Sequence, residues 1–288
     1  MIAVDWGTTQ CRAYRMRAGL VVDRRESRSG ILYVTDGDFA GALGSIVSPW
    51  VADGESRILL AGMVGSRSGW VETPYLACPV SCADLVAGLV DVPYEGALVR
   101  VVQGISTVDA AGVPDFIRGE EAQIFGAGIR NGMACLPGSH SKWVNVVDEC
   151  IVDFSTHLTG ETYAALREHT ILARSMGEGP MVEAAFDDGV VRSAQAGGVL
   201  HHLFGVRALS LTSRLAAPAA ASYLSGLLVG HEVRAALRAE SEVHVIGAPD
   251  LAGLYARAIT ICGGVPRIAS ADAAAIGLAR IAEWARWT

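Results

Sequence analysis

The chain has 288 residues, of which 51% are apolar and 18% charged, and this composition excludes intrinsic disorder as the main state because a core can form. The formal net charge of −7 argues against a protein that mainly binds nucleic acid, since phosphate backbones are bound by surplus Lys and Arg. No uncharged stretch reaches the roughly 20 apolar residues of a membrane-spanning helix, and no basic and apolar leader opens the sequence. We therefore expect a cytoplasmic protein of about two domains, with no nucleic-acid or membrane partner.

Strands and helices alternate along the first part of the chain. Short apolar runs bounded by turn residues predict strands at residues 2–4, 11–16, 20–27 and 58–61. Apolar residues three and four positions apart predict a helix at residues 39–50, and a second helix is expected at residues 118–125, where it ends at a glycine-rich segment. This alternation favours an α/β architecture.

The second part of the chain continues the alternation. Apolar runs predict strands at residues 134–136, 143–147, 151–156 and 243–246. The helical spacing predicts helices at residues 161–169, 181–187, 197–209, 219–239, 251–261 and 272–287. Between the two parts, Gly112 and the bond from Val113 to Pro114 interrupt regular structure. We therefore expect one domain over residues 1–113 and a second over residues 114–288.

A unit of strand, loop and hairpin occurs twice in the sequence. Shifting its first occurrence by 131 positions places Gly7 on Gly138 and Thr8 on Ser139, and it places the third strand of one unit on the third strand of the other. A unit that returns once in each half of the chain predicts two similarly folded domains.

The loops of these two units have the chemistry of anion-binding loops. Each offers glycine for a close approach, hydroxyl donors, and backbone N–H groups that can converge on an anion. The candidate phosphate-binding residues are Gly7, Thr8, Thr9 and Arg12 in the first unit, and Gly138, Ser139, His140, Ser141 and Lys142 in the second. Asp5 precedes the first loop and is a candidate for Mg²⁺, with water between them because Mg²⁺ dehydrates reluctantly. One such loop is more often an ordinary turn, whereas two related loops together would hold a polyphosphate.

Four segments in order along the chain resemble motifs of the sugar kinases in the acetate kinase, Hsp70 and actin superfamily. Residues 5–13, 119–128, 137–139 and 245–251 resemble the first phosphate motif, the segment with the catalytic aspartate, the second phosphate motif and the adenosine motif. The resemblance implies two ribonuclease H-like (actin-like ATPase) domains that hold ATP and Mg²⁺ in a cleft between them. It also implies that the turn at Gly247 and Ala248 contacts the nucleotide.

Further segments narrow the resemblance to one family. Residues 61–66, 69–70, 74–75, 118–121, 137–143 and 158–161 are similar to the 2-dehydro-3-deoxygalactonokinases. This resemblance implies that the chain uses ATP to phosphorylate the terminal (C6) hydroxyl of 2-dehydro-3-deoxy-D-galactonate, a small-molecule sugar acid. A kinase of another sugar acid, ketose or polyol stays open as an alternative, as does a non-catalytic, nucleotide-gated binding protein. The sequence also leaves open whether the chain forms a homo-oligomer.

The same resemblance assigns the general base, which takes the proton of the attacking hydroxyl. In the sugar kinases this group is an aspartate, and Glu120 stands at the corresponding position here. Glu121 stays open as the alternative, because the segment is one residue shorter than its counterpart before Phe125. An acidic pair at this place could also simply complement a helix N-terminus.

Other residues are candidates for contacts with the sugar acid. A guanidinium group is the usual partner of a carboxylate, so Arg118 and Arg67 are candidates, with Lys142 as a third. Met63, Trp70 and Tyr75 are expected in the wall of the pocket, although ordinary core packing would explain them nearly as well.

Overall fold

The structure is a computed structural model that describes residues 1–238 and 241–287, and the chain folds into two compact units. Unit 1 comprises Met1–Asn131, Val144–Phe154 and Ser270–Thr288, and unit 2 comprises Gly132–Trp143 and Ser155–Ala269. This grouping differs from the expected division at residue 113. Gly112 lies in a turn between two paired strands, both of which belong to unit 1.

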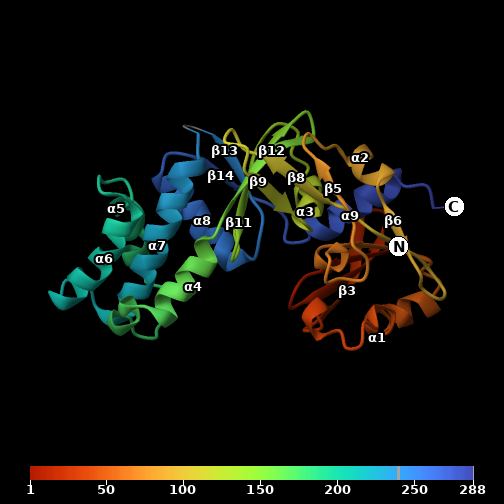
Figure 1. The fold of residues 1–288 in the computed structure, drawn as a ribbon, viewed down its shortest axis with the longest axis horizontal. Helices are drawn as coiled ribbons and strands as arrows, with labels where there is room; N and C mark the ends of the chain where they lie inside the picture. Colours follow the sequence, from red (N-terminus) through yellow and green to blue (C-terminus); the bar gives the residue numbers. More distant parts are fainter. Residues whose placement is uncertain (239–240, 288) are drawn as a thin grey trace. The chain divides into compact units, whose positions relative to one another are not determined.

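The main sheet of unit 1 has six strands in the order β3-β2-β1-β4-β7-β6 (Figure 1). These strands are β1 (Ile2–Trp6), β2 (Cys11–Arg17), β3 (Leu20–Ser27), β4 (Arg57–Ala61), β6 (Val90–Val92) and β7 (Leu98–Val101). Strand β1 runs antiparallel to β2 and parallel to β4, and β4 runs parallel to β7. Parallel strands are normally covered on both faces, so layers are expected on either side of this sheet.

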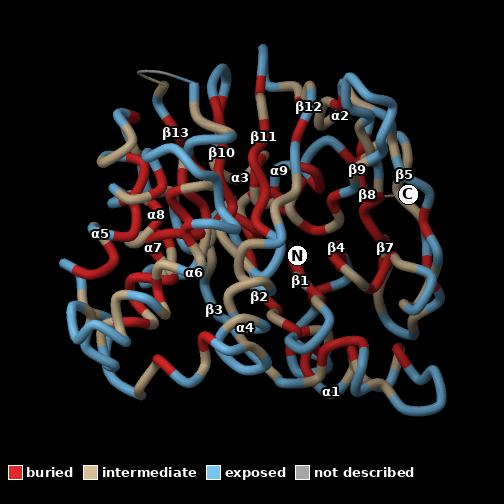
Figure 2. Tube along the Cα trace, turned by 60° about the vertical axis from the view of Figure 1, so that its left-hand side comes forward, coloured by how far each residue is buried: buried red, intermediate tan, exposed pale blue. Residues whose placement is uncertain are grey.

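Both faces of the sheet are covered. On one face, alternate β1 residues such as Val4 and Trp6 pack in one cluster with the apolar side of α1 (Phe39–Ala52). On the other face Ala3 is fully buried, and α9 (Ala273–Trp284) contacts β1 and β4. Figure 2 shows that β1, β4 and β7 consist mainly of buried residues. The carboxyl end of β1, where Asp5 lies, is therefore fixed by packing on two sides.

Helix α3 (Glu120–Ala127) is held against α9 by a close approach between two glycines. A Cβ at Gly126 would lie 1.7 Å from the carbonyl oxygen of Ala273, and a Cβ at Gly277 would lie 1.7 Å from that of Ala122. Only glycine fits at these two positions, because any larger residue would push the helices apart. The predicted helix at residues 118–125 is thus confirmed, and its N-terminus has a fixed place beside β1.

A smaller sheet and short elements of unit 1 were not expected from the sequence. The sheet has the order β5-β8-β9, with β5 (Tyr75–Ala77), β8 (Gly104–Val108) and β9 (Pro114–Ile117). The other short elements are α2 (Cys82–Ala87) and the 3-10 turns Ile31–Tyr33 and Met63–Gly65.

The second half of the chain holds a five-stranded sheet in the order β12-β11-β10-β13-β14. Its strands are β10 (Gly132–Leu136), β11 (Ser141–Val147), β12 (Cys150–His157), β13 (Glu242–Val245) and β14 (Val265–Ile268). Strand β13 runs parallel to both β10 and β14. Apolar residues of β10 and β13 form one core with α5 (Glu183–Arg192), α7 (Ala217–Ala236) and α8 (Pro249–Ile261), and Cys135, Val245 and Tyr255 are members of this core.

The helices of unit 2 are α4 (Thr159–His169), α5 (Glu183–Arg192), α6 (Gly198–Leu211), α7 (Ala217–Ala236) and α8 (Pro249–Ile261), with a 3-10 turn at Ile171–Ser175. Helices α5, α6 and α7 pack around a second apolar cluster beyond the sheet, and Figure 1 shows these three helices side by side. The helix predicted at residues 219–239 ends at Ala236, and Ala239 lies outside the described residues. In the parts of the chain that the structure describes, no helix is long and apolar enough to cross a membrane.

The internal repeat is visible in the strand bounds. A shift of 130 positions carries the bounds of β1, β2 and β3 onto those of β10, β11 and β12. The shift is one position shorter than the sequence suggested, and it pairs Thr9 with Ser139 and Arg12 with Lys142. In both sheets the first strand of the repeat also has a parallel neighbour on its other side, β4 or β13, so the α/β fold class with two similar halves is confirmed.

Candidate active site

The loop between β1 and β2, Gly7–Gln10, is referred to below as the first phosphate loop. It closes on itself through a hydrogen bond of 2.9 Å from the N–H of Gly7 to the carbonyl oxygen of Gln10. The N–H groups of residues 30, 31 and 32 donate to the carbonyl oxygens of Thr9, Gly7 and Thr8. Thr8 and Thr9 are exposed, and among the described residues their own N–H groups donate to no protein acceptor. The loop therefore offers exposed hydroxyl and N–H donors on a braced backbone, as an anion site requires.

Asp5 lies at the end of β1, where the backbone of three segments converges. Gly62 and Gly119 both have positive φ, at 97° and 105°, and a Cβ on Gly119 would lie 3.0 Å from the Cα of Gly62. A Cβ on Gly62 would lie 3.5 Å from the Oδ1 atom of Asp5. The structure therefore brings Asp5 next to the N-terminus of α3.

The charge of Asp5 is disfavoured where it lies. Burial raises the pKa of Asp5 to about 6, the nearby guanidinium of Arg12 lowers it, and Glu120 raises it further. The Nη1 atom of Arg12 is 3.7 Å from the Oδ2 atom of Asp5. A carboxylate with a raised pKa in contact with solvent is a strong candidate for binding a cation, because a cation would restore its charged form.

The two candidate bases have different surroundings. Glu121 is fully buried, its Oε2 atom accepts a hydrogen bond of 2.6 Å from the N–H of Gly119, and its Oε1 atom has no hydrogen-bond partner among the residues that the structure describes. Burial, followed by the charge of Glu120, raises the pKa of Glu121 to about 8. Glu120 is half-buried, and its Oε2 atom accepts from the N–H of Arg118 at 2.8 Å. Of the two, only Glu120 is in contact with solvent.

The structure places Arg118 against Tyr75, and it places Arg67 in solvent. The Nη2 atom of Arg118 donates to the carbonyl oxygen of Thr73 at 3.0 Å, Nη1 donates to the hydroxyl of Thr73, and the guanidinium lies 4.2 Å from the centre of the Tyr75 ring. Arg67 is 88% exposed at its side chain and pairs with Glu72 at 3.6 Å. Thr73 positions Arg118 through these hydrogen bonds. The sequence did not predict this role, because a single threonine belongs to no recognisable motif.

Met63 and Trp70 belong to the edge of the unit 1 core. Both are partly buried and pack against the apolar cluster under α1, and Trp70 stacks on Phe39 with ring centres 6.2 Å apart. Tyr75 is 41% exposed and packs on Phe116 at 4.8 Å. Core packing thus accounts for most of the surface of Met63 and Trp70, and Tyr75 is the most exposed of the three expected wall residues.

The loop between β10 and β11, Pro137–His140, is the second phosphate loop. The carbonyl oxygen of Ser139 accepts a hydrogen bond of 3.0 Å from the N–H of Glu161 near the start of α4, and the side chains of His140 and Glu161 form an ion pair when His140 is protonated. A Cβ on Gly160 would lie 2.5 Å from the carbonyl oxygen of Gly138. The loop is therefore braced by α4, and Ser139 and His140 are exposed.

Lys142 and Ser141 point away from the exposed side of this loop. Lys142 is 6% exposed, and its Nζ atom donates to the carbonyl oxygen of His140 at 2.8 Å. Ser141 is fully buried, and its hydroxyl lies 2.8 Å from the Oε1 atom of Glu232. The expected contact between Ser141 and a phosphate stays a prediction. The hydrogen bond to Glu232 does not support it, because it engages the Ser141 hydroxyl inside the protein. Glu232 itself was not found from the sequence, because a single glutamate in a long helix gives no signal.

The turn at Gly247 and Ala248 follows β13 and lies beside the second phosphate loop. A Cβ on Gly247 would lie 3.6 Å from the Cδ atom of Pro137, and the N–H of Ile246 donates to the carbonyl oxygen of Cys135 at 2.9 Å. Both segments follow the carboxyl ends of neighbouring parallel strands, where ligands of α/β sheets bind. Within the described residues, no group of three or more His, Cys, Asp or Glu side chains could by itself hold a metal ion.

Comparison with known proteins gives matches over nearly the whole chain. A sequence profile of the family described as 2-keto-3-deoxy-galactonokinase matches residues 5–281. A relative from Rhizobium meliloti (strain 1021), assigned as a 2-dehydro-3-deoxygalactonokinase, is 33% identical over 94% of this chain and 92% of its own length. The 2-dehydro-3-deoxygalactonokinase of Escherichia coli (strain K12) is 29% identical over 98% of this chain and 97% of its own length.

A solved structure agrees with the sequence matches. A crystal structure from Sinorhizobium meliloti, assigned as a 2-dehydro-3-deoxygalactonokinase, has a TM-score of 0.90 and 32% identity, and the match covers 98% of each chain. The matches confirm the family resemblance inferred from the motifs, together with the actin-like ATPase fold class that it implied.

Proposed function

We propose, from the premise that this chain belongs to the 2-keto-3-deoxy-galactonokinase family, that it transfers the γ-phosphoryl group of ATP to the C6 hydroxyl of 2-dehydro-3-deoxy-D-galactonate. The chain is a phosphotransferase, and its relatives at 29% and 33% identity are named for this substrate. The observation that carries the proposal is the grouping of Asp5, Glu120 and the first phosphate loop at the carboxyl end of β1.

Glu120 is the proposed general base. The oxygen of the C6 hydroxyl attacks the γ-phosphorus, the hydroxyl proton passes to the carboxylate of Glu120, and the bond from the γ-phosphorus to the bridging oxygen of ADP breaks. Little covalent work is left to the protein in such a transfer, so positioning and charge stabilisation dominate. The contact of Glu120 with solvent supports this assignment over Glu121, which is buried.

Asp5 fits a Mg²⁺ ion that accompanies ATP. Its carboxylate has a pKa raised to about 6 and is joined by the negative charge of Glu120, so a cation is favoured there. Mg²⁺ bound with ATP neutralises charge on the phosphate oxygens. Asp5 would hold the ion through water, because a single carboxylate leaves most of its coordination to water and phosphate.

Each phosphate loop, taken by itself, carries donors suited to phosphate oxygens. In unit 1 these are the hydroxyl and N–H groups of Thr8 and Thr9, with Arg12 beside them. In unit 2 they are the exposed residues Ser139 and His140, and the turn at Gly247 and Ala248 is assigned to the adenosine. Lys142 lies beneath its loop and contributes positive charge there rather than an exposed contact.

Arg118 and Tyr75 are proposed to bind the sugar acid. Thr73 holds the guanidinium in one orientation, which lowers the entropy cost of pairing with the substrate carboxylate. Among the described residues the one ion-pair partner of Arg67 is Glu72 on the surface, so we assign the carboxylate to Arg118.

A substrate panel tests the proposed function. Purified protein is given ATP, Mg²⁺ and one sugar acid, ketose or polyol at a time, and ADP release is followed by a coupled assay. We expect ADP release above background with 2-dehydro-3-deoxy-D-galactonate and at least about tenfold lower kcat/KM for its C4 epimer. A higher kcat/KM for another compound would identify a different sugar kinase. ATP binding without substrate-dependent turnover on any compound would favour a nucleotide-gated binding protein.

A further inference from the structure

Glu232 is a buried carboxylate that none of the proposed chemical steps uses. It lies in α7, is 4% exposed, and accepts three hydrogen bonds from neutral donors. Its Oε1 atom accepts from the Ser141 hydroxyl and from Nε1 of Trp143, both at 2.8 Å. Its Oε2 atom accepts from the Tyr255 hydroxyl at 2.7 Å, and that hydroxyl also lies 3.4 Å from the oxygen of Ser141.

The donors belong to the two elements that follow the segments assigned to the nucleotide in unit 2. Ser141 is the first residue of β11 and follows the second phosphate loop without a gap. Tyr255 lies in α8, which begins at Pro249 immediately after the turn at Gly247 and Ala248. One carboxylate is therefore hydrogen-bonded to the element after each of these two segments.

Burying the Glu232 carboxylate costs free energy of folding, so we expect it to have a role besides filling space. Removing a carboxylate from water carries a penalty that three neutral hydrogen bonds offset only in part, and apolar side chains of similar volume often stabilise a core as well or better. The benefit that such a group does provide is a fixed geometry, because each donor has a single direction in which it is satisfied. The strongly raised pKa of the Tyr255 hydroxyl, caused by burial and then by the charge of Glu232, keeps that donor protonated.

We propose that Glu232 is a positioning residue for the nucleotide, which fixes the second phosphate loop relative to the turn at Gly247 and Ala248. It does so by holding Ser141, Trp143 and Tyr255 at once. This inference rests on the proposed assignment of both segments to ATP. Its consequence is specific: loss of Glu232 weakens the binding of ATP and leaves the binding of the sugar acid, which is assigned to unit 1, unchanged.

The test compares Glu232→Leu with Glu232→Gln. Leucine keeps the approximate volume and removes both acceptor oxygens, whereas glutamine keeps one acceptor and offers an N–H donor that the Tyr255 oxygen can accept. We expect Glu232→Leu to raise both the KM for ATP and the dissociation constant of a nonhydrolysable ATP analogue by about tenfold or more, with the KM for the sugar acid within about twofold of wild type. Glu232→Gln should stay within about threefold of wild type in all three quantities.

Ser193→Ala is the matched control for a general loss of stability. Ser193 is also buried in unit 2, where its hydroxyl donates to the carbonyl oxygen of Val190 and accepts from Arg234. It contacts neither nucleotide segment through these bonds, so its variant should melt at a lower temperature and keep the wild-type KM for ATP. Equal shifts of the ATP constants in Ser193→Ala and Glu232→Leu would overturn the positioning role.

A milder variant covers the case in which Glu232→Leu does not fold. Tyr255→Phe removes one donor and no carboxylate, and we expect it to raise the dissociation constant of the ATP analogue by a few fold, about 3 to 5, without changing the KM for the sugar acid. Unchanged analogue binding in a folded Glu232→Leu, or in Tyr255→Phe if the leucine variant does not fold, refutes the inference while the kinase assignment stands. Absence of analogue binding by the wild-type protein would instead refute the proposed function.

Discussion

Two neighbouring carboxylates at the start of α3 differ because their surroundings differ. Glu121 is enclosed by protein, and within the described part of the chain one of its oxygens has no hydrogen-bond partner, so burial favours its neutral form. Glu120 is next to it in sequence, is partly exposed to solvent, and interacts electrostatically with Asp5. Chemistry on a bound substrate needs a group that the substrate can reach, and only Glu120 meets this condition.

Replacing Glu120 by glutamine removes the proton acceptor and keeps the size of the side chain. We expect Glu120→Gln to lower kcat by about 10² to 10⁴ and to leave the KM for ATP within about twofold, because the base acts in the transition state and not in nucleotide binding. Steady-state kinetics with both substrates varied will measure this. Glu121→Gln is the control, with an expected loss in kcat below about tenfold; the opposite order of the two effects would make Glu121 the base.

At the scale of elements, the sequence predicted the long and strongly patterned pieces. The hairpin β2-β3, the helices α1 and α9 and the parallel strands β1 and β4 all follow from periodicity and apolar runs. The elements between Tyr75 and Ile117 were missed, since their strands have three to five residues and most of them include polar residues that interrupt the apolar run. The contacts that hold the candidate site in place could not be predicted either. Gly30, Thr73 and Glu232 contact residues far from them in sequence, and no local pattern indicates such contacts.

The bracing of the first phosphate loop gives a prediction about Gly30. A Cβ at this position would lie 2.4 Å from backbone atoms of Thr8 and Thr9, so Gly30→Ala must displace the loop. The φ of Gly30 is −61°, which alanine adopts without strain, and the effect is therefore steric. We expect the KM for ATP to rise by about tenfold or more, measured by ADP release at saturating sugar acid.

Gly19 provides the control for this substitution. It lies in the turn between β2 and β3 with φ at +76°, and no neighbouring atom of the described residues lies within 4 Å of the Cβ that alanine would add. Gly19→Ala should lower the free energy of unfolding by about 1 kcal/mol through backbone strain and keep the wild-type KM for ATP. A similar rise in that KM in both variants would show that the loop responds to general destabilisation and not to the clash at Gly30.

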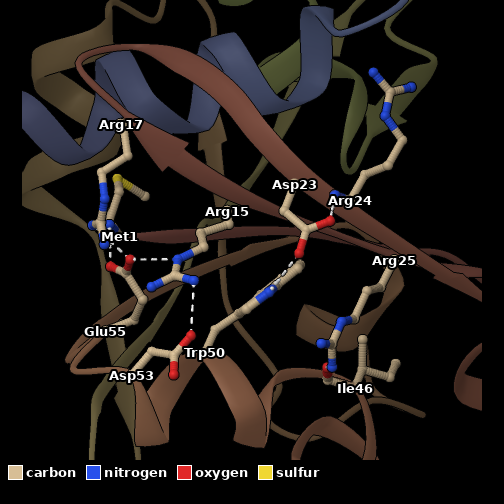
Figure 3. Close-up of polar contacts among 10 residues, drawn as sticks. All are labelled: Met1, Arg15, Arg17, Asp23, Arg24, Arg25, Ile46, Trp50, Asp53 and Glu55. Carbon is tan, nitrogen blue, oxygen red and sulfur yellow. Dashed lines mark hydrogen bonds and ion pairs between the residues drawn. The ribbon is translucent and has the colours of Figure 1, made fainter.

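At the scale of the whole molecule, pH acts on stability in two opposite directions. Glu55 is 4% exposed and contacts the N-terminal ammonium group at 2.6 Å, Arg15 at 2.9 Å and Arg17 at 2.5 Å (Figure 3). Burial alone would raise the pKa of Glu55, but the hydrogen bonds from the N-terminus and Arg15 outweigh it and lower that pKa below its usual value. Glu121 is shifted the other way, to about 8. Both groups belong to unit 1, so one unfolding transition should report on both.

The signs of these two contributions differ, and paired variants separate them. The stabilisation from Glu55 is complete above its unfolded pKa of 4.5 and is lost as the pH falls through its lower folded value. Glu55→Gln should therefore lower the free energy of unfolding by about 2 kcal/mol at pH 7 and progressively less below pH 4.5.

For Glu121 the neutral form is favoured in the folded state, so its contribution to the free energy of unfolding declines as the pH rises from 4.5 to about 8. Glu121→Gln should therefore gain stability relative to wild type over that range, on the order of 4 kcal/mol at its upper end. Urea unfolding of the three proteins between pH 4 and about 9 measures both differences, and a constant offset between Glu121→Gln and wild type across this range would contradict the buried, neutral state of Glu121.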